Sequence, residues 1–130
     1  MVRRICLDSD VLIALLNDDQ PTKEIVESLD ADFYTTAINS FELWQGRKKV
    51  EPVFGLLSSL HQLALHDIAA RLAADILREL KAKGKILDLR DLFIASLCIN
   101  EGIELLTYNT KHFERLKEFG LILVEHAKGR

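Results

Sequence analysis

Two carboxylates interrupt an otherwise apolar stretch near the start of the chain, 4-RICLDSDVLIALLNDD-19. Asp8 and Asp10 stand between two runs that both favour burial. Either acid could simply cap a helix, because a carboxylate there accepts a hydrogen bond from a free backbone N–H. The alternative is that the pair belongs to a metal site. The rest of the chain must decide between these interpretations.

Three further polar residues could join such a site. Glu42 lies in the apolar context SFELW, where a buried carboxylate would need a cation or several donors. Asp91 falls at the start of an expected helix, either as a functional acid or as part of a capping arrangement begun by Asp88. Asn109, in TYNT, suits a turn but also offers an oxygen ligand.

Carboxylates crowded together repel one another unless a cation intervenes. Mg²⁺ prefers oxygen ligands, keeps several waters and needs only one or two direct carboxylates. Such an ion suits phosphodiester hydrolysis. It would also reverse the local charge, so that an acidic chain could bind a polyanion.

The elements that must position these acids alternate between strand and helix. Strands are predicted over residues 2–7, 33–36, 62–65, 103–108 and 121–125, and helices over 10–17, 21–30, 38–49, 50–60, 67–84, 88–102 and 112–119. This alternation predicts an α/β fold with a parallel sheet covered by helices on both faces. Ligands of such folds bind beyond the carboxyl ends of the strands, where Asp8, Glu42, Asp91 and Asn109 are expected to converge.

The helix over 67–84 has the clearest pattern, with Ile68, Leu72, Ile76 and Leu80 expected on one buried face. Ser9 or Asp10 is expected to cap the first helix, and Asp88 the helix over 88–102.

Length and composition narrow the class of protein. A length of 130 residues predicts a single domain over 1–130, and a net charge of −3 argues against a protein that holds nucleic acid mainly by its charge. Cys6 and Cys98, each inside an apolar run, are expected to be reduced, buried thiols of a cytoplasmic protein. No apolar stretch approaches the roughly 20 residues of a membrane span, and the early acids argue against an export signal.

Other chemistries fit poorly. Gly-rich phosphate-binding motifs are absent from the sequence. The four histidines have neither metal-type spacing nor a partner in a nucleophile motif.

The segments ICLDSDVLIALL, AINSFELWQG and LDLRDLFIASLCINEGIELLTYNTKHFERLKEFGLILVE resemble PIN-domain proteins, in particular VapC toxins of VapBC toxin–antitoxin modules. The resemblance covers nearly the whole chain in the family's order. It implies a three-layer α/β/α sandwich around a small, mainly parallel sheet, and an endoribonuclease that depends on Mg²⁺ or Mn²⁺. It further implies a homodimer inhibited by a small VapB-like antitoxin.

The resemblance also implies roles for individual residues. Asp8 and Asp91 would be the direct metal ligands, and Glu42 would assist as a ligand or by positioning water. Ser9, Asp88 and Thr107 are supporting candidates. Asn109 stands where many members carry a fourth aspartate, so one metal is expected to bind well and a second only together with the RNA phosphate.

Basic residues near these acids are candidates for contacts with RNA phosphates: Arg47, Lys48, Lys85 and Arg90. Two alternatives to a toxin are a housekeeping RNA-processing nuclease and a non-catalytic interaction module whose acids cap helices and bind an arginine of a partner. Metal binding would separate the non-catalytic module from the toxin and the housekeeping nuclease.

Overall fold

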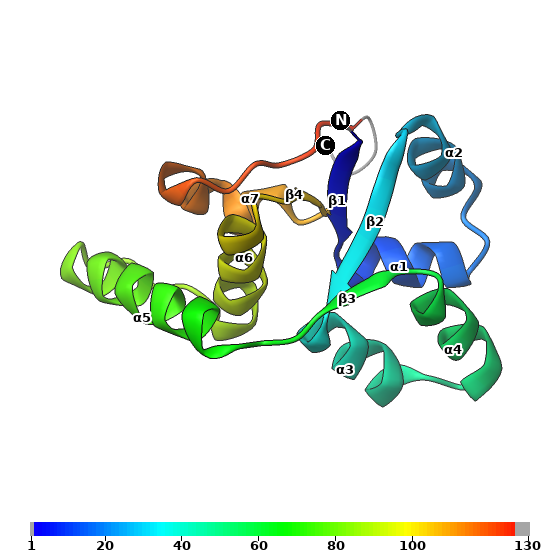
Figure 1. The fold of residues 1–130 in the computed structure, drawn as a ribbon, viewed down its shortest axis with the longest axis horizontal. Coiled ribbons are helices and arrows are strands. Elements are labelled where there is room, and N and C mark those ends of the chain that lie inside the picture. Colours follow the sequence, from blue (N-terminus) through cyan, green and yellow to red (C-terminus); the bar gives the residue numbers. More distant parts are fainter. Residues whose placement is uncertain (1, 127–130) are drawn as a thin grey trace.

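The computed structural model describes residues 2–126, which fold around a four-stranded parallel sheet (Figure 1). The strands are β1 (Arg3–Leu7), β2 (Ala31–Thr36), β3 (His61–Leu63) and β4 (Glu104–Leu106), and their order is β3-β2-β1-β4. β1 is therefore central, paired with β2 on one side (Cys6 opposite Tyr34) and with β4 on the other (Cys6 opposite Leu105). The predicted α/β class is confirmed.

Helices cover both faces of the sheet. They are α1 (Ser9–Leu16), α2 (Gln20–Ser28), α3 (Ala37–Gly46), α4 (Val50–Ser58), α5 (Asp67–Ala82), α6 (Leu89–Glu101) and α7 (Thr110–Phe113), followed by a 3₁₀ helix over Glu114–Phe119. Figure 1 shows α1, α2 and α4 on one side of the strands and α5, α6 and α7 on the other. This is the three-layer arrangement expected of the fold.

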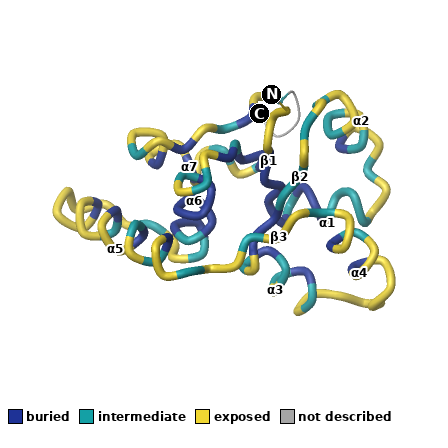
Figure 2. Tube along the Cα trace, viewed as in Figure 1, coloured by how far each residue is buried: buried dark blue, intermediate teal, exposed yellow. Residues whose placement is uncertain are grey.

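The side chains of β1 alternate between the two faces of the sheet and so belong to two separate parts of the core. Ile5 and Leu7 pack with α1 and α4, whereas Cys6 packs with α5 and α6. Successive strand residues point to opposite faces, so the part of β1 that is covered on both sides, residues 5–7, must be apolar at every position. In Figure 2 the buried residues accordingly follow β1 and the inner side of α6.

Helix α5 is amphipathic, and of its predicted face Ile76 and Leu80 are buried while the half-buried Leu72 packs against the core. The buried residues are Ala69, Ala73, Ile76 and Leu80, whereas Ile68 is exposed. Both sets follow helical spacing, and the small alanines allow α5 to approach α6 closely. A pattern scored on large side chains alone misses a face built partly from alanine.

Four further predictions need correction. Residues 121–125 do not form a strand: their only ladder contact is a single parallel bridge between Leu105 and Leu123. The helix predicted over 38–49 ends at Gly46, and the next residue is extended. The last helix begins at Thr110 and continues in 3₁₀ form. The N-cap of α1 is Asp8, one of the two acids considered as caps, and neither Ser9 nor Asp10.

Within residues 2–126, none of the helices is both long enough and apolar enough to cross a membrane.

Candidate functional site

Asp8 lies at the junction of β1 and α1 and is completely buried. Its Oδ1 accepts hydrogen bonds from the backbone N–H of Ser9 (2.8 Å) and from Nδ2 of Asn39 (2.9 Å). Its Oδ2 accepts one from Oγ1 of Thr107 (2.7 Å), just beyond β4. Asp8 therefore caps a helix and also sits at the centre of a polar cluster, so the two interpretations of this acid are compatible.

Glu42 reaches the cluster from the next strand–helix junction. A capping box between Thr36 and Asn39 begins α3 immediately after β2, and Glu42 follows one turn later on the same side of the helix. Oγ of Ser9 donates a hydrogen bond of 2.5 Å to Oε1 of Glu42. Glu42, which would need a cation or several donors if buried, is thus half-buried and hydrogen-bonded.

Asp91 and its neighbour Arg90 come from the first turn of α6. Oδ1 of Asp88 accepts from the backbone N–H of Arg90 at 2.8 Å, so the predicted capping role of Asp88 is confirmed. The buried Asp91 accepts a bond of 2.7 Å from Nη1 of Arg90.

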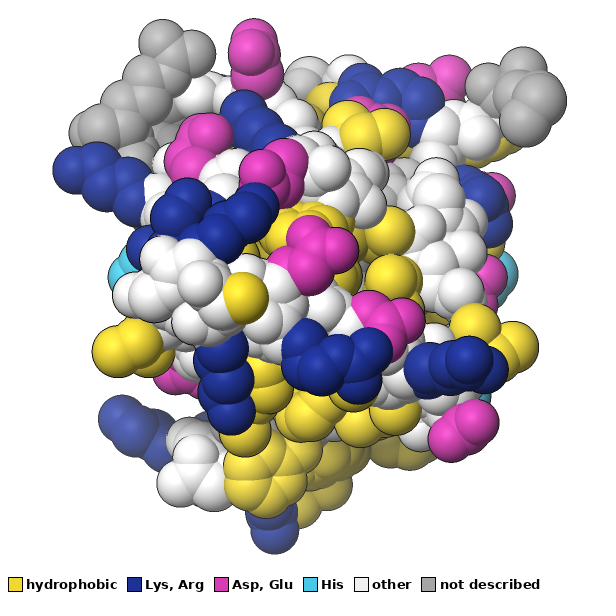
Figure 3. All heavy atoms as spheres, turned by 90° about the vertical axis from the view of Figure 1, so that its left-hand side faces the viewer, with side chains coloured by type: hydrophobic (Ala, Val, Ile, Leu, Met, Phe, Trp, Pro, Cys, Tyr) yellow, Lys and Arg dark blue, Asp and Glu magenta, His cyan; other side chains and the backbone are white. Residues whose placement is uncertain are grey.

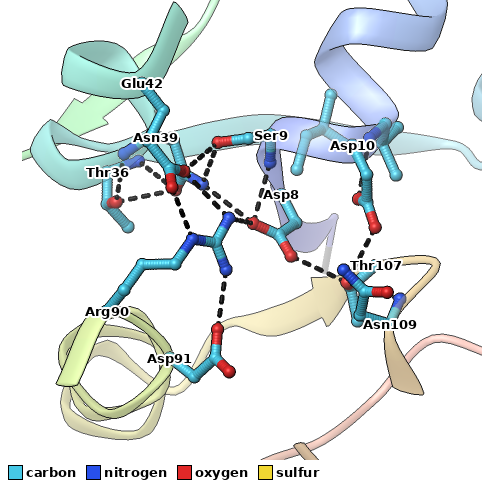
Figure 4. Close-up of polar contacts among 12 residues, drawn as sticks. Asp8, Ser9, Asp10, Thr36, Asn39, Glu42, Arg90, Asp91, Thr107 and Asn109 are labelled. Carbon is cyan, nitrogen blue, oxygen red and sulfur yellow. Dashed lines mark hydrogen bonds and ion pairs between the residues drawn. The ribbon is translucent and has the colours of Figure 1, made fainter. Parts of the chain in front are cut away.

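The Arg90 guanidinium joins all three acids (Figure 4). Besides Asp91, it binds Glu42 through Nε (2.7 Å) and Nη2 (2.9 Å), and Nη2 also donates to Oδ1 of Asp8 at 2.7 Å. The expected convergence of Asp8, Glu42 and Asp91 at the carboxyl edge of the sheet is therefore present. Three negative charges face one positive charge here.

Arg90 corrects a prediction. The sequence places it among the residues that face RNA phosphates, but its side chain turns inward and is bound to the three carboxylates. The reason is electrostatic, because the guanidinium forms charge-assisted hydrogen bonds with two buried carboxylates, Asp8 and Asp91, and with the half-buried Glu42. Arg47, Lys48 and Lys85 are exposed, as expected of residues available to a polyanion. Arg47 donates to the backbone oxygen of Trp44 at 2.6 Å.

Asn109 lies beside the cluster rather than in it. Its side chain is exposed, and its backbone N–H donates to Oγ1 of Thr107 at 3.1 Å. Thr107 thus links Asn109 to Asp8.

Asp10 forms the outer part of the same edge. Its Oδ2 accepts from the backbone N–H of Tyr108 at 3.0 Å and its Oδ1 from that of Val11 at 2.8 Å. Burial and the nearby charge of Asp8 raise the pKa of Asp10. This acid tightens the junction between α1 and the end of β4.

The remaining acids differ in their electrostatics. Burial raises the pKa of Asp91 in spite of its bonds to Arg90. Burial acts in the same direction on Glu42, but the hydrogen bonds from Arg90 and Ser9 outweigh it and lower the pKa of Glu42. Burial by itself lowers the pKa of Arg90. The hydrogen bonds with Glu42 and the charge of Asp8 outweigh burial and raise this pKa, so Arg90 stays protonated.

Three residues at the site escape sequence reasoning. Asn39 is fully buried and donates to both Asp8 and Ser9. Thr36 orients Asn39 through the capping box, and Nδ1 of His112 lies 3.5 Å from Oδ2 of Asp91. The spacing of Thr36 and Asn39 just after an apolar strand could have indicated the cap, but not its contact with Asp8.

The spacing of the acids matches a guanidinium. In this arrangement, no three acidic, histidine or cysteine side chains of residues 2–126 are close enough together to hold one metal ion. Nitrogen–oxygen bonds of 2.7–2.9 Å hold the carboxylates further apart than the roughly 2.1 Å metal–oxygen bonds of Mg²⁺ would. The oxygen-only donor set itself is the kind that Mg²⁺ and Mn²⁺ prefer.

Comparison with known proteins defines the family. The PIN domain model matches residues 5–118. Ribonuclease VapC1 of Methanocaldococcus jannaschii is 35% identical over 121 residues, which cover 91% of this chain and 85% of the relative. Ribonuclease VapC3 of the same organism is 31% identical over 91 residues, covering 70% of this chain and 94% of the relative. The chain belongs to the PIN domain family.

Solved structures agree on the architecture. VapBC2 from Rickettsia felis, bound to a DNA fragment from their promoter, aligns with a TM-score of 0.78 and 27% identity over 93% of this chain and 97% of the other. DNA-bound VapBC from Salmonella typhimurium gives a TM-score of 0.78 at 24% identity, over 95% of this chain and 98% of the other. The latter likeness concerns the fold alone.

Proposed function

We propose that this chain is a metal-dependent endoribonuclease of the VapC kind and the toxin component of a toxin–antitoxin module. The observation that carries the proposal is the convergence of Asp8, Glu42 and Asp91 on one cationic group at the carboxyl edge of a parallel sheet. The relatives named ribonuclease VapC support the activity. The VapBC complexes among the structural relatives support the biological role.

Asp8 and Asp91 would hold the metal ion, Mg²⁺ or Mn²⁺. The donor set fits such an ion, because the acids supply only oxygen atoms and carry more negative charge than Arg90 neutralises. When bound, the ion supplies Lewis-acid polarisation of the phosphate and a more acidic bound water.

The chain's own groups perform the remaining tasks. Asn39 and Thr107 fix the orientation of the Asp8 carboxylate. Glu42, the most exposed of the three acids, would orient water at the rim of the site or assist as a ligand. Ser9 aligns Glu42 by its 2.5 Å hydrogen bond. Asn109 would at most offer a neutral oxygen at the outer edge.

RNA is the proposed substrate, held locally rather than by overall charge. On the face shown in Figure 3, lysines and arginines are interspersed with acids rather than gathered in one field. Arg47, Lys48 and Lys85 stay our candidates for phosphate contacts beside the site. Single-stranded RNA would give the best access to the scissile bond, because its backbone can bend into the site.

The partners that follow from this proposal are a VapB-like antitoxin and a second copy of the chain. A groove of about 470 Å³ runs beside Glu42 between α1, α3 and α4, and its lining includes the apolar Ile13, Leu16, Leu43 and Val53. Exposed Phe41 and Phe54 add apolar surface on the same helices. Such a surface suits a protein partner.

The buried free thiols of Cys6 and Cys98 support the expected cytoplasmic location.

RNA cleavage tests the catalytic proposal. The wild-type protein should cut single-stranded RNA with Mg²⁺ or Mn²⁺ and stop when EDTA is added. Asp8→Asn and Asp91→Asn should each lower the rate by at least about a hundredfold, since they remove the ligand charge and keep the side-chain volume. Asp75→Asn, at an exposed acid of α5, is the matched control. Unchanged cutting by either site variant would refute the assignment.

The toxin role needs a separate test. Expression of the wild-type chain alone should arrest growth, whereas Asp91→Asn should not. Growth arrest that is relieved by a small protein encoded beside this gene would support the antitoxin. A metal-dependent nuclease that leaves growth unaffected would instead be a housekeeping RNA-processing enzyme.

A further inference from the structure

Arg90 occupies the space between Oδ1 of Asp8 and Oδ1 of Asp91. Its guanidinium makes four hydrogen bonds of 2.7–2.9 Å to Asp8, Glu42 and Asp91. It uses Oδ1 of Asp8 and Oδ1 of Asp91, which belong to the two acids proposed as direct ligands. No other lysine or arginine among residues 2–126 forms an ion pair with any of these three acids.

The guanidinium and the metal ion exclude each other from that position. An ion bound to both aspartates would lie about 2.1 Å from their oxygens, inside the space that the nitrogens of Arg90 now fill. Its two positive charges would also repel the guanidinium strongly at that separation. An ion that binds these same two oxygens therefore requires Arg90 to leave Asp8 and Asp91.

The Arg90 side chain can move toward solvent. Asp8 and Asp91 are at the inner end of the cluster, with side chains 0% and 6% exposed, whereas those of Arg90 and Glu42 are 25% and 30% exposed. The two-bond contact with Glu42 thus lies toward solvent. Withdrawal in that direction breaks the two inner contacts and lets Arg90 keep Glu42.

We propose that Arg90 is an internal counter-ion that competes with the metal for Asp8 and Asp91 and withdraws toward Glu42 when the metal binds. This inference rests on the proposed metal-dependent function. It assigns Arg90 two consequences: the residue stabilises the metal-free protein by neutralising buried acids, and it weakens the affinity of the site for metal. A permanent structural ion pair would give only the first.

The test is the affinity for Mn²⁺, followed by electron paramagnetic resonance of the free ion. Arg90→Gln should bind Mn²⁺ about tenfold more tightly than the wild type, because the competing charge is gone. Arg90→Lys keeps a charge but lacks the planar fork, so its affinity should fall between the two. Arg78→Gln removes an exposed arginine that pairs with Asp75 on α5, and it should match the wild type.

Thermal unfolding gives a second, independent readout. Without metal, Arg90→Gln should melt below the wild type, since three acids lose their common partner. Saturating Mn²⁺ should raise its melting temperature more than that of the wild type, in keeping with the tighter binding. Circular dichroism before heating tests whether Arg90→Gln is folded. If it is not, Arg90→Lys is compared with the wild type instead.

The possible failures are distinguishable. If the wild type cuts RNA with Mn²⁺ and Arg90→Gln binds the ion equally or more weakly, Arg90 is not a competitor, while the proposed nuclease stands. If neither protein binds Mn²⁺, the proposed function fails, and the inference about Arg90 fails with it.

Discussion

Asn39 donates a 2.9 Å hydrogen bond from Nδ2 to Oδ1 of Asp8, so that the start of α3 fixes an acid at the end of β1. The same amide also donates to Oγ of Ser9 at 2.9 Å, while its own Oδ1 accepts from Oγ1 of Thr36 at 2.6 Å. One fully buried side chain thus connects two strand–helix junctions at the edge of the sheet.

Replacement of Asn39 by alanine should therefore affect both folding and cutting. We expect a loss of about 2–3 kcal/mol in the free energy of unfolding, because buried partners are left without hydrogen bonds. We expect RNA cleavage to slow by about 10- to 100-fold, as is typical when a side chain that orients a metal ligand is lost. Urea denaturation and cleavage assays measure the two effects.

Asn39→Asp separates the two roles of this residue. An aspartate can still accept the bonds from Thr36, but it cannot donate to Asp8 and adds a like charge beside it. The capping box should survive in this variant while cleavage falls. If Asn39→Asp cut RNA at the wild-type rate, support of Asp8 by Asn39 would be unnecessary for activity.

Asp10 should leave a signature in the pH dependence of stability. Burial, together with the charge of Asp8, raises its pKa above the ordinary value of 3.8. An acid whose pKa is raised in the folded state contributes most stability below its unfolded-state pKa, and this contribution is lost as the pH rises through the folded-state pKa. The amide that replaces this carboxyl in the variant Asp10→Asn does not titrate.

The stability of Asp10→Asn relative to the wild type should therefore improve as the pH rises from below 3.8 to neutrality. Asparagine loses one acceptor for the N–H groups of Val11 and Tyr108, so the informative quantity is this change with pH rather than the absolute difference. Chemical denaturation at a series of pH values measures it. Parallel curves for the two proteins would contradict a raised pKa.

The cysteines should be inert while the protein is folded. A hydrogen bond with Cys98, together with burial, raises the pKa of Cys6 well above its ordinary range, and both residues are fully buried. The reactive thiolate is therefore scarce. At about pH 8, a thiol-reactive dye should label the urea-unfolded chain rapidly and the folded chain only at the rate of unfolding. Rapid labelling of the folded protein would show that a thiol is accessible.

Much of the fold is predictable because its signals are local. The helices α5 and α6, the strand before Asp8 and the alternation of strand and helix follow from periodicity, caps and glycines close together in the chain. The segment 121–125 is apolar enough for a strand, but its single bridge to Leu105 depends on how the chain returns to β4. Pairing of that kind is set by tertiary contacts rather than by local propensity.

The acids of the site are predictable from the sequence, whereas their partners are not. Asp8, Glu42 and Asp91 stand out because charges are rare in apolar segments. Arg90 looks like an ordinary exposed arginine, since its partners Asp8 and Glu42 are 82 and 48 residues away in sequence. Asn39 has no charge to distinguish it from other helix-capping residues. Which way such side chains turn depends on what the fold places opposite them.

Asp8 and Asp91 together should bind a divalent ion that the nuclease reaction requires, and every other role proposed for the site depends on this. A crystal structure with saturating Mn²⁺, recorded with its anomalous signal, tests it most directly. We predict an anomalous peak about 2.0–2.3 Å from carboxylate oxygens of both residues, with the Arg90 guanidinium withdrawn toward Glu42. A structure at saturating Mn²⁺ without a peak between Asp8 and Asp91, and with Arg90 still bonded to both, would contradict it.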